Sequence, residues 1–211
     1  SAKLFLNPTK IPYHDPFLLK DMEKACQRLL SALKNKEKIC IYGDYDVDGV
    51  SSTALLMTVF TKLGFNIDYY LPDRHSEGYG LHIESLQKLI PKYDLLITVD
   101  CGITALDEVD YAKDKIDMII TDHHLPREIL PDAFAIINPT QTHCNYPNKN
   151  LCGVGVAFKL CQGLYQSLNK DIHELENYLD IVALGTIADI VPPVDENRRI
   201  VKKGLAHIQN L

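Results

Sequence analysis

The sequence predicts an α/β protein: a mostly parallel β-sheet with helices on both faces, followed by a helical C-terminal part. Short apolar runs alternate with segments whose apolar residues recur at helical spacing, which is the pattern of βαβ units and a parallel sheet. After Pro139 this alternation stops, and helical segments follow a polar loop. The chain has 211 residues, 46% of them hydrophobic, which is enough for one sizeable core with a small appended subdomain.

The individual elements follow from periodicity and from helix start and stop signals. Residues 17–33 have apolar side chains at helical spacing, and Asp15-Pro16 before them suits a helix start. Residues 39–42 form a short buried strand, and a helix over residues 51–63 is ended by Gly64. The further elements are strands at 67–71, 95–99, 118–121 and 133–137, helices at 82–90, 104–115, 153–168, 172–184 and 197–208, and a polar loop at 140–150.

The bulk properties indicate a reduced, cytoplasmic setting. No run of about 18 apolar residues occurs, so the sequence predicts no transmembrane helix. The first residues, Ser1-Ala2-Lys3, lack the apolar core of a signal peptide. None of the six cysteines forms a Cys-x-x-Cys pair, and three sit in apolar runs typical of buried thiols. Cys144 and Cys152 flank a loop that could bind a metal together with His143, but the ligand spacing of a zinc site is missing.

Acidic residues follow four apolar runs, where strands are expected to end. The carboxyl ends of parallel strands meet at one edge of an open α/β sheet, and sites form there. Carboxylates gathered at that edge would repel each other strongly unless cations held them. The residues concerned are Asp44, Asp46, Asp48, Asp100, Asp122 and Asp189.

The formal net charge of −6 is unusual for a protein that binds nucleic acid. The six carboxylates of these segments equal that charge, and two divalent cations would offset four of the negative charges. A multi-metal hydrolytic site that acts on phosphates is therefore compatible with an acidic chain.

The first acidic segment contains Asp44, Asp46 and Asp48 within five residues. In an extended loop these side chains would point the same way, and carboxylates are hard ligands suited to Mg²⁺ or Mn²⁺. Alternatively one of them, or Ser51, caps the following helix and the others are solvated. The loop is not a dinucleotide fingerprint, a P-loop or an EF-hand, because it lacks the glycine pattern, the Gly-Lys-Ser/Thr sequence and the closing glutamate of those motifs.

The tripeptide Asp122-His123-His124 is the sharpest of the other acidic segments. Two adjacent imidazoles point in different directions, so one can bind a metal while the other faces the substrate, and Asp122 can orient either ring. Asp100 follows a central strand and is the natural bridge between two ions about 3.5–4 Å apart, which would polarise a phosphoryl group and generate hydroxide. Taken alone, Asp100 fits a turn as well as a metal site, and Asp189 fits a cap or turn residue better than a metal ligand.

The acidic segments form four motifs that occur together and in this order: Gly-Asp-Tyr-Asp-Val-Asp-Gly, Val-Asp-Cys-Gly, Thr-Asp-His-His and Leu-Gly-Thr-Ile-Ala-Asp-Ile-Val-Pro. Together they resemble the motifs of the DHH phosphoesterase superfamily. The Tyr-Gly-Asp-Tyr-Asp form of the first, with Pro72-Asp73-Arg74 and Glu77-Gly78-Tyr79-Gly80-Leu81, resembles the RecJ branch in particular. The resemblance runs from about residue 4 to the end of the chain.

The resemblance implies an exonuclease that depends on Mn²⁺ or Mg²⁺ and digests single-stranded DNA from the 5′ end in repair and recombination. It implies that Asp46 binds one ion, Asp48 the other and Asp100 both. His124 is implied to contact the scissile phosphate. The residues implied to complete the second metal site are His123 and Asp189.

The first metal site departs from the superfamily pattern. Many members carry a histidine four residues before the first of the paired aspartates, where this sequence has Tyr42. Asp44 is therefore a further candidate ligand of the first ion. The same departure argues against a family II inorganic pyrophosphatase.

Several residues outside the four motifs are candidates for holding the substrate. Arg74 and His75 are expected to clamp phosphate, since arginine suits bidentate phosphate contact. Gly153 and Gly155 either offer backbone N–H groups to an anion at a helix start or allow close helix packing. Tyr79 either stacks on a base or belongs to the core.

The resemblance also implies a domain organisation and partners. Superfamily members carry a second domain, DHHA1, after a linker helix, and RecJ proteins add an OB-fold. We therefore expect a DHH catalytic domain over residues 1–195 and the start of the linker helix over residues 196–211, with DHHA1 absent from this sequence. The expected partners are single-stranded DNA and, by resemblance, a single-strand-binding protein and a helicase, but no membrane. This piece is expected to have weak or no processive activity.

Two other functions compete with the exonuclease. One is a phosphodiesterase of short oligonucleotides or cyclic dinucleotides, against which the segment at 74–81 favours a RecJ-type substrate. The other, from a different class, is an inactive scaffold on the same fold, as in some replication factors. The intact carboxylates of all four motifs argue against a scaffold.

Overall fold

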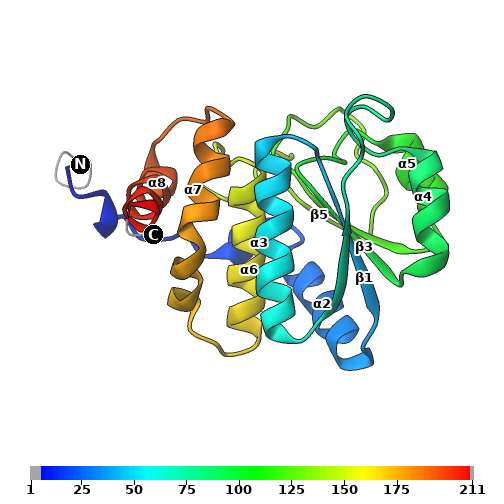
Figure 1. The fold of residues 1–211 in the computed structure, drawn as a ribbon, viewed down its shortest axis with the longest axis horizontal. Coiled ribbons are helices and arrows are strands. Elements are labelled where there is room, and N and C mark those ends of the chain that lie inside the picture. The colour runs from blue at the N-terminus through cyan, green and yellow to red at the C-terminus, as the bar shows by residue number, and fades with distance from the viewer. Residues whose placement is uncertain (1–5, 210–211) are drawn as a thin grey trace.

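The computed structural model describes residues 6–209 and confirms the α/β class. A five-stranded sheet has the strand order β2-β1-β3-β4-β5, and every neighbouring pair is parallel (Figure 1). Each predicted strand is present with its ends shifted by at most two residues. The strands are β1 (Lys38–Gly43), β2 (Asn66–Tyr70), β3 (Leu95–Val99), β4 (Asp117–Thr121) and β5 (Ala135–Ile137).

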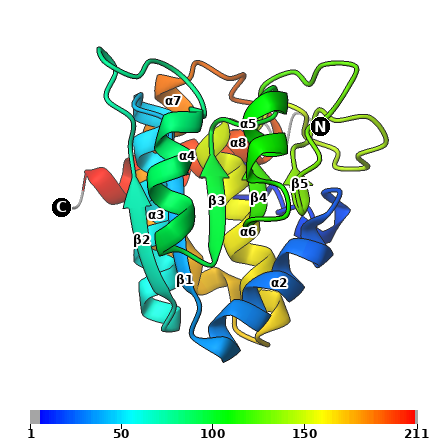
Figure 2. The same cartoon turned by 90° about the vertical axis from the view of Figure 1, so that its right-hand side faces the viewer.

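Helices cover both faces of the sheet, as predicted. Figure 2 views the sheet with α4 (Ile83–Leu89) and α5 (Leu106–Ala112) in front of it. The opposite face packs against α2 (Met22–Asn35), α3 (Val47–Leu63) and α6 (Gly153–Ser167). A helical C-terminal part, α7 (Leu179–Ala188) and α8 (Asp195–Ile208), packs outside α3 and α6. No helix within residues 6–209 has the length and apolar character needed to cross a bilayer.

The strands read as continuous apolar runs because both of their faces are buried. Successive side chains of β1 point to opposite faces. Ile39 and Ile41 join the core under α2, α3 and α6, whereas Cys40 and Tyr42 join the core under α4 and α5. This double burial explains why the strands were recognisable from the sequence.

The strand order places a topological switch point between β1 and β3. From β1 the chain leads to α3 on one face of the sheet, and from β3 it leads to α5 on the other face. The carboxyl ends of the two strands therefore border a crevice, which is where open α/β sheets bind ligands. Asp44 follows β1 and Asp100 follows β3, so both lie at this point.

The predicted helix over residues 17–33 is wrong at its start. Residues Pro16–Leu18 form a separate 3₁₀ turn, in which the Asp15 carboxylate accepts the N–H of Phe17 at 3.0 Å. The α2 helix begins at Met22, after Asp21 in the left-handed region at φ 62°. Asp21 also accepts the N–H of Ile136 at 3.1 Å, so a tertiary contact sets the start of the helix.

The helix predicted over residues 51–63 begins four residues earlier than expected. Asp46 is its N-cap, with its carboxylate accepting the N–H of Gly49 at 2.9 Å. The expected extended loop is therefore wrong: Asp48 lies in the first helical turn, and Ser51 is a buried helical residue rather than the cap. Gly64 ends the helix at φ 87°, as predicted.

The region before Asp189 also differs from the prediction. The expected helix over residues 172–184 divides into a 3₁₀ segment, Ile172–Tyr178, and the α7 helix, which continues to Ala188. Asp189 is the C-cap of α7 and does not follow a strand. The acidic side chain still reaches the edge of the sheet because α7 packs against α3.

Candidate metal centre

The junction between β1 and α3 brings three carboxylates to the switch point. Asp44 is 3% exposed, and the following turn is so tight that a Cβ atom on Gly49 would lie 2.5 Å from the backbone oxygen of Asp44. Glycine at position 49 therefore permits the turn. The turn aims Asp44 and Asp46 at the end of β3, while Asp48 points from the first turn of α3 toward α6.

The amino terminus of α6 holds the carboxylate of Asp48. The N–H of Gly153 donates to one oxygen at 2.6 Å and the N–H of Val154 to the other at 2.8 Å. The first N–H groups of a helix have no partner inside the helix, and its dipole favours a negative charge there. Gly153 was predicted to donate its backbone N–H to the substrate phosphate. In the structure this N–H group already donates to Asp48.

Two glycines let helices approach the carboxylates more closely than any other residue would allow. A Cβ atom on Gly153 would lie 2.6 Å from Oδ1 of Asp100, and one on Gly185 would lie 2.9 Å from Oδ1 of Asp48. A Cβ atom on Gly155 would instead lie 3.3 Å from the side chain of Leu151. Of the two alternatives for Gly155, this contact matches close helix packing. Gly185 lies in the fourth motif, but nothing in the sequence around it indicated this close approach.

Asp100 lies in a strained turn at the end of β3. Its φ of 61° is in the left-handed region, which a non-glycine residue seldom adopts. The backbone N–H of Asp100 donates to the carbonyl of Thr121 at 3.0 Å, and Gly102 follows at φ 108°. The turn buries the carboxylate to 2% exposure and points it at the other acidic groups. Strain of this kind is typical of functional sites.

Asp122 orients His124, as the sequence predicted for one of the two rings. Its Oδ1 atom accepts the backbone N–H groups of His123 and His124, and also Nδ1–H of His124 at 2.8 Å. Its Oδ2 atom accepts the N–H of Ile103 at 2.9 Å. Burial alone would raise the pKa of Asp122, but these bonds outweigh it and lower the pKa. The same hydrogen bond raises the pKa of His124 to about 9.

His123 lies at the centre of the acidic cluster. Its Nε2 atom is 3.2 Å from Oδ1 of Asp100, 3.7 Å from Oδ2 of Asp189 and 3.9 Å from Oδ2 of Asp48. In each of three groups of side chains, the possible ligand atoms lie within 4.8 Å of one another. The groups are Asp44, Asp46 and Asp100; Asp48, His123 and Asp189; and Asp100, His123 and His124.

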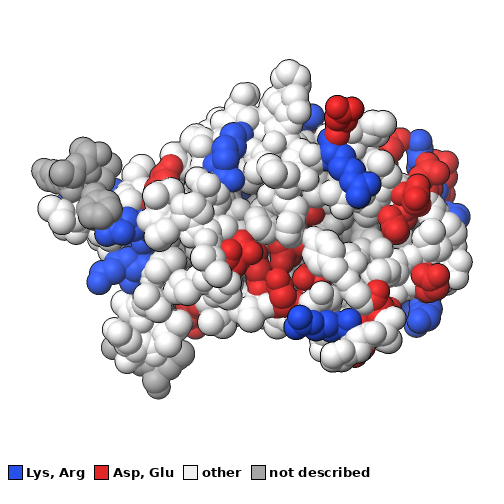
Figure 3. Space-filling model, turned by 90° about the horizontal axis from the view of Figure 1, so that it is seen from above, with Lys and Arg blue, Asp and Glu red and all other residues white. Residues whose placement is uncertain are grey.

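The clustered carboxylates repel each other, as their positions in the sequence predicted. Burial and the neighbouring carboxylates Asp48 and Asp46 raise the pKa of Asp100 to about 10. Burial raises the pKa of Asp48 to about 6, and it also raises the pKa of Asp44 and Asp189. Figure 3, which looks down on this edge of the sheet, shows acidic side chains gathered in the middle of the face. Such crowding favours cations.

Unsatisfied polar atoms also fit divalent ions. Three of the buried side-chain atoms that lack a hydrogen-bond partner among the described residues lie in the cluster: Oδ1 of Asp44, Oδ1 of Asp100 and Nε2 of His123. Buried polar atoms normally have partners, and a bound ion would supply one to each of these three. Carboxylate oxygens with one or two imidazoles are a donor set that Mn²⁺ and Mg²⁺ accept.

Tyr42 lies on the other face of β1. Its hydroxyl donates to the carbonyl of Gly80 at 3.1 Å, and its ring packs against Tyr70 at 5.3 Å between centroids. Tyr42 therefore supports the segment after β2 and offers no ligand to the cluster. Asp44 instead groups with Asp46 and Asp100, and its role as a ligand stays a prediction.

The predicted phosphate clamp lies on the exposed segment between β2 and α4. The guanidinium carbon of Arg74 is 5.4 Å from the ring centroid of Tyr45, which stands between two of the clustered aspartates. Arg74 is therefore at the rim of the metal centre. For His75 the structure records a backbone contact, its N–H donating to Asp73 at 3.0 Å. The phosphate contacts of both residues remain predictions.

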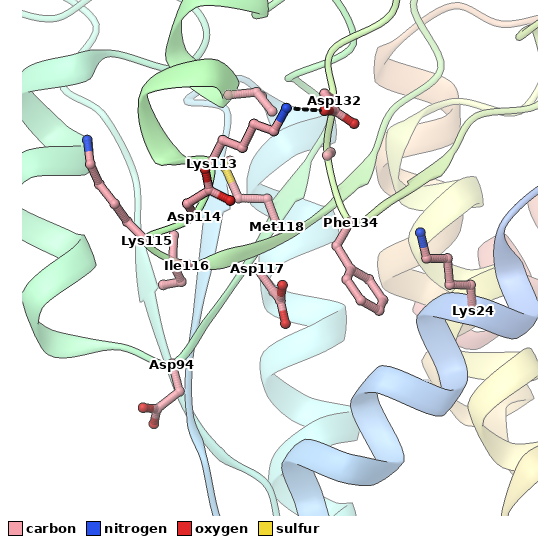
Figure 4. Close-up of a pocket in the computed structure, with 12 residues that line it drawn as sticks. Lys24, Asp94, Lys113, Asp114, Lys115, Ile116, Asp117, Met118, Asp132 and Phe134 are labelled. Atoms are coloured by element: carbon pink, nitrogen blue, oxygen red, sulfur yellow. Dashed lines mark ion pairs between the residues drawn. The ribbon is translucent and has the colours of Figure 1, made fainter.

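A hollow of about 560 Å³ lies at the opposite edge of the sheet, where β4 and β5 begin (Figure 4). Two ion pairs hold three of its charged lining residues: Lys113 contacts Asp132 at 2.6 Å, and Asp117 contacts Arg28 at 2.6 Å. The hollow is separated from the acidic cluster by the length of the strands. It therefore contributes nothing to the chemistry at the switch point.

The sequence profile described as "DHH family, N-terminal domain" matches residues 38–186, which include all the clustered side chains except Asp189. The chain belongs to the DHH family. The chain is similar to curated RecJ proteins, the branch that its motifs resemble. The single-stranded-DNA-specific exonuclease RecJ of Bacillus subtilis is 46% identical over 211 residues, which are 99% of this chain and 26% of the relative. RecJ of Escherichia coli is 42% identical over 90% of this chain and 35% of the relative.

Solved structures agree with this placement in the DHH family. The exonuclease RecJ bound to manganese matches with a TM-score of 0.84 and 36% identity, over 91% of this chain and 49% of that one. RecJ of Thermus thermophilus in complex with Mn²⁺ matches with a TM-score of 0.79 and 34% identity, over 91% of this chain and 28% of that one. The chain thus spans between about a quarter and a half of the length of the RecJ proteins it matches.

Proposed function

We propose that this chain binds two Mn²⁺ or Mg²⁺ ions and is the catalytic core of a 5′→3′ exonuclease for single-stranded DNA. The observation that carries the proposal is the convergence around His123 of carboxylates from separate segments. Nε2 of His123 lies 3.2 Å from the Asp100 carboxylate, and Asp48 and Asp189 lie within 4 Å of the same nitrogen. The RecJ relatives supply the substrate class, because they are named single-stranded-DNA-specific exonucleases.

The groups of side chains support a division of ligands between the ions. We assign Asp46 and Asp100 to the first ion, with Asp44 in place of the histidine that Tyr42 replaces. The residues assigned to the second ion are Asp48, Asp100, His123 and Asp189. When bound, such a pair of ions polarises a phosphoryl group, lowers the pKa of bound water and stabilises the leaving oxygen.

The protein's own groups orient the substrate. The protonated His124, held through Nδ1 by Asp122, is suited to donate from Nε2 to an oxygen of the scissile phosphate. Arg74 at the rim, with His75 beside it, is suited to a neighbouring phosphate. Gly153 acts on the metal centre instead, because its N–H group holds Asp48.

The wider setting follows from the family. Residues 1–195 form the catalytic domain in this proposal, and α8 begins a linker helix toward a second domain that would add another wall to the DNA channel. A cytoplasmic role in DNA repair and recombination, with a single-strand-binding protein and a helicase as partners, belongs to the same proposal. The piece alone would then hydrolyse DNA without processivity.

Metal titration and a substrate series test the proposal. Calorimetry with Mn²⁺ should show binding by the wild type that Asp100→Asn abolishes, while Asp110→Asn, on the exposed side of α5, leaves it unchanged. The metal-loaded chain should release mononucleotides from single strands labelled at one end and spare a duplex. Absence of Mn²⁺ binding by the wild type would favour an inactive scaffold. Hydrolysis confined to di- and trinucleotides would favour an oligonucleotide phosphodiesterase.

A further inference from the structure

Tyr79 lies between two turns of the metal centre. It belongs to the segment that joins β2 to α4, and it stands between Gly78 at φ 81° and Gly80 at φ 90°. This backbone path carries the ring over the edge of the sheet. The hydroxyl lies 3.3 Å from the backbone oxygen of Asp100 and 3.3 Å from Nδ1 of His124. The ring meets the imidazole of His124 edge-on, with 5.7 Å between centroids.

The hydrogen-bond roles at the Tyr79 hydroxyl follow from its neighbours. The carbonyl of Asp100 can only accept, so the Tyr79 O–H donates to it. Nδ1–H of His124 donates mainly to Asp122 at 2.8 Å, and the hydroxyl oxygen is its second acceptor. Although Tyr79 is 48% exposed, desolvation of its hydroxyl and the nearby carboxylates raise its pKa far above the usual value, so the hydroxyl stays protonated. One hydroxyl thus links the turn after β3 to the turn after β4.

The segment that carries Tyr79 is anchored on both sides of it. On the amino-terminal side, the Glu77 carboxylate accepts the hydroxyls of Tyr70 at 2.5 Å and Ser85 at 2.6 Å. On the carboxyl-terminal side, Tyr42 donates to the carbonyl of Gly80 at 3.1 Å. Hydrogen bonds from three groups lower the pKa of Glu77 to about 2, so it stays an acceptor at neutral pH. Hydrogen bonds on both sides of Tyr79 therefore fix the segment that carries its ring.

We propose that Tyr79 is a positioning residue that fixes the ring of His124 relative to Asp100. His124 has a side chain 44% exposed, and its bond to Asp122 alone would leave the ring free to tilt about that bond. The second contact, through Tyr79, removes this freedom and directs Nε2 toward the place that the proposed function gives to the scissile phosphate. Catalytic geometry has to be held within about 0.5 Å, which a single hydrogen bond on an exposed ring does not ensure. The inference rests on the proposed function.

A different role for Tyr79, stacking on a base, predicts different behaviour. Stacking needs the aromatic ring and not the hydroxyl, so Tyr79→Phe would leave it intact and Tyr79→Ala would weaken DNA binding. Positioning through the hydroxyl predicts that Tyr79→Phe is already impaired. Tyr93→Phe is the matched control, because Tyr93 also donates its hydroxyl to a protein group, Asp68 at 2.9 Å, but precedes β3 at the opposite edge of the sheet.

The kinetic test uses Mn²⁺-loaded chain with bis(p-nitrophenyl) phosphate and with a single-stranded oligonucleotide. Tyr79→Phe should lower kcat about tenfold, as expected for one lost hydrogen bond at the reacting centre, with KM and Mn²⁺ affinity within about twofold of wild type. In a His124→Ala background the same substitution should cause no further loss, because Tyr79 acts through that ring. Tyr93→Phe should match the wild type.

A second readout does not depend on activity. In ¹⁵N spectra of the histidine rings, recorded without Mn²⁺, the resonances that His124→Ala removes should shift in Tyr79→Phe and stay in place in Tyr93→Phe. Unshifted resonances, wild-type kcat in Tyr79→Phe, or additive losses with His124→Ala would each overturn the positioning role. If the wild type itself hydrolyses neither substrate, the proposed function fails, and the ring spectra still decide whether Tyr79 holds His124.

Discussion

The carboxylate of Asp48 accepts the backbone N–H of Gly153 at 2.6 Å, across 105 positions of sequence. This contact joins the first turn of α3 to the first turn of α6, and it places a candidate metal ligand at the positive end of a helix dipole. The helix partly compensates the burial of Asp48, whose pKa still rises to about 6. The position of one ligand therefore depends on the packing of two helices against the sheet.

Gly153→Ala should damage the metal centre and the fold together. The added Cβ would lie 2.6 Å from Oδ1 of Asp100, so either the carboxylate or α6 must move. We expect a loss of about 1–3 kcal/mol in the free energy of unfolding and at least a tenfold loss of Mn²⁺ affinity. Gly155→Ala is the control on the same helix, since its Cβ would meet Leu151 at 3.3 Å. Equal Mn²⁺ affinity of the two variants, measured by calorimetry, would contradict the role given to Gly153.

Asp100→Asn should stabilise the metal-free protein while removing its metal affinity. Burial and the neighbouring carboxylates make a charge at this position costly, and an amide of the same shape carries none. We expect the melting temperature in EDTA to rise by a few degrees, corresponding to about 1 kcal/mol in a chain of this length. With saturating Mn²⁺ the order should reverse, because the ion stabilises the wild type alone. A lower melting temperature of the variant in EDTA would contradict this account.

The stability of the metal-free protein should fall as the pH rises. The pKa of Asp48 is raised to about 6 and that of Asp100 to about 10, above the ordinary value of 3.8. The folded state then keeps protons that the unfolded state has released, so the free energy of unfolding decreases with pH from about 4 upward. Urea unfolding in EDTA at pH 5, 6, 7 and 8 measures the trend. In saturating Mn²⁺ the decrease should be suppressed, because the ion replaces those protons. A flat profile in EDTA would show that the carboxylates do not crowd each other in solution.

The strands and the acidic edge were predictable because their signals are local. Residues Leu95–Val99 are apolar at every position but Thr98 and buried on both faces, and an aspartate follows directly. The parallel order of strands then brings Asp44, Asp100 and the Asp-His-His segment to one edge, whatever the details of packing.

The features that were missed depend on contacts far apart in the sequence. Nothing near Asp48 indicates that it meets the start of α6, so the first turn of α3 read as a loop. The start of α2 is set by the bond between Asp21 and Ile136, 115 positions apart. Likewise, the role of Gly153 depends on the carboxylates that pack against it, and its position in the sequence indicated only a helix start.

Breaking the buried pair of Lys159 and Glu196 should destabilise the protein strongly. The Lys159 ammonium lies 2.7 Å from Glu196, and both side chains are 0% exposed, so the pair joins α6 to the start of α8. Glu196→Ala leaves a buried ammonium without its counter-ion, and burial already lowers the pKa of Lys159. We expect a loss of about 3–5 kcal/mol in the free energy of unfolding, measured in urea.

Two further variants separate the buried charge from ordinary packing. Lys203→Met removes a partly exposed partner of Glu176, contacted at 2.6 Å, and should cost about 1 kcal/mol or less because solvent screens that pair. The double variant Lys159→Met/Glu196→Leu removes both buried charges and should recover most of the loss, since neither ion is then left unpaired. If the double variant is as unstable as Glu196→Ala, the loss comes from the hydrogen bonds of Glu196 and Lys159 with Tyr146 and Gln162 rather than from the stranded charge.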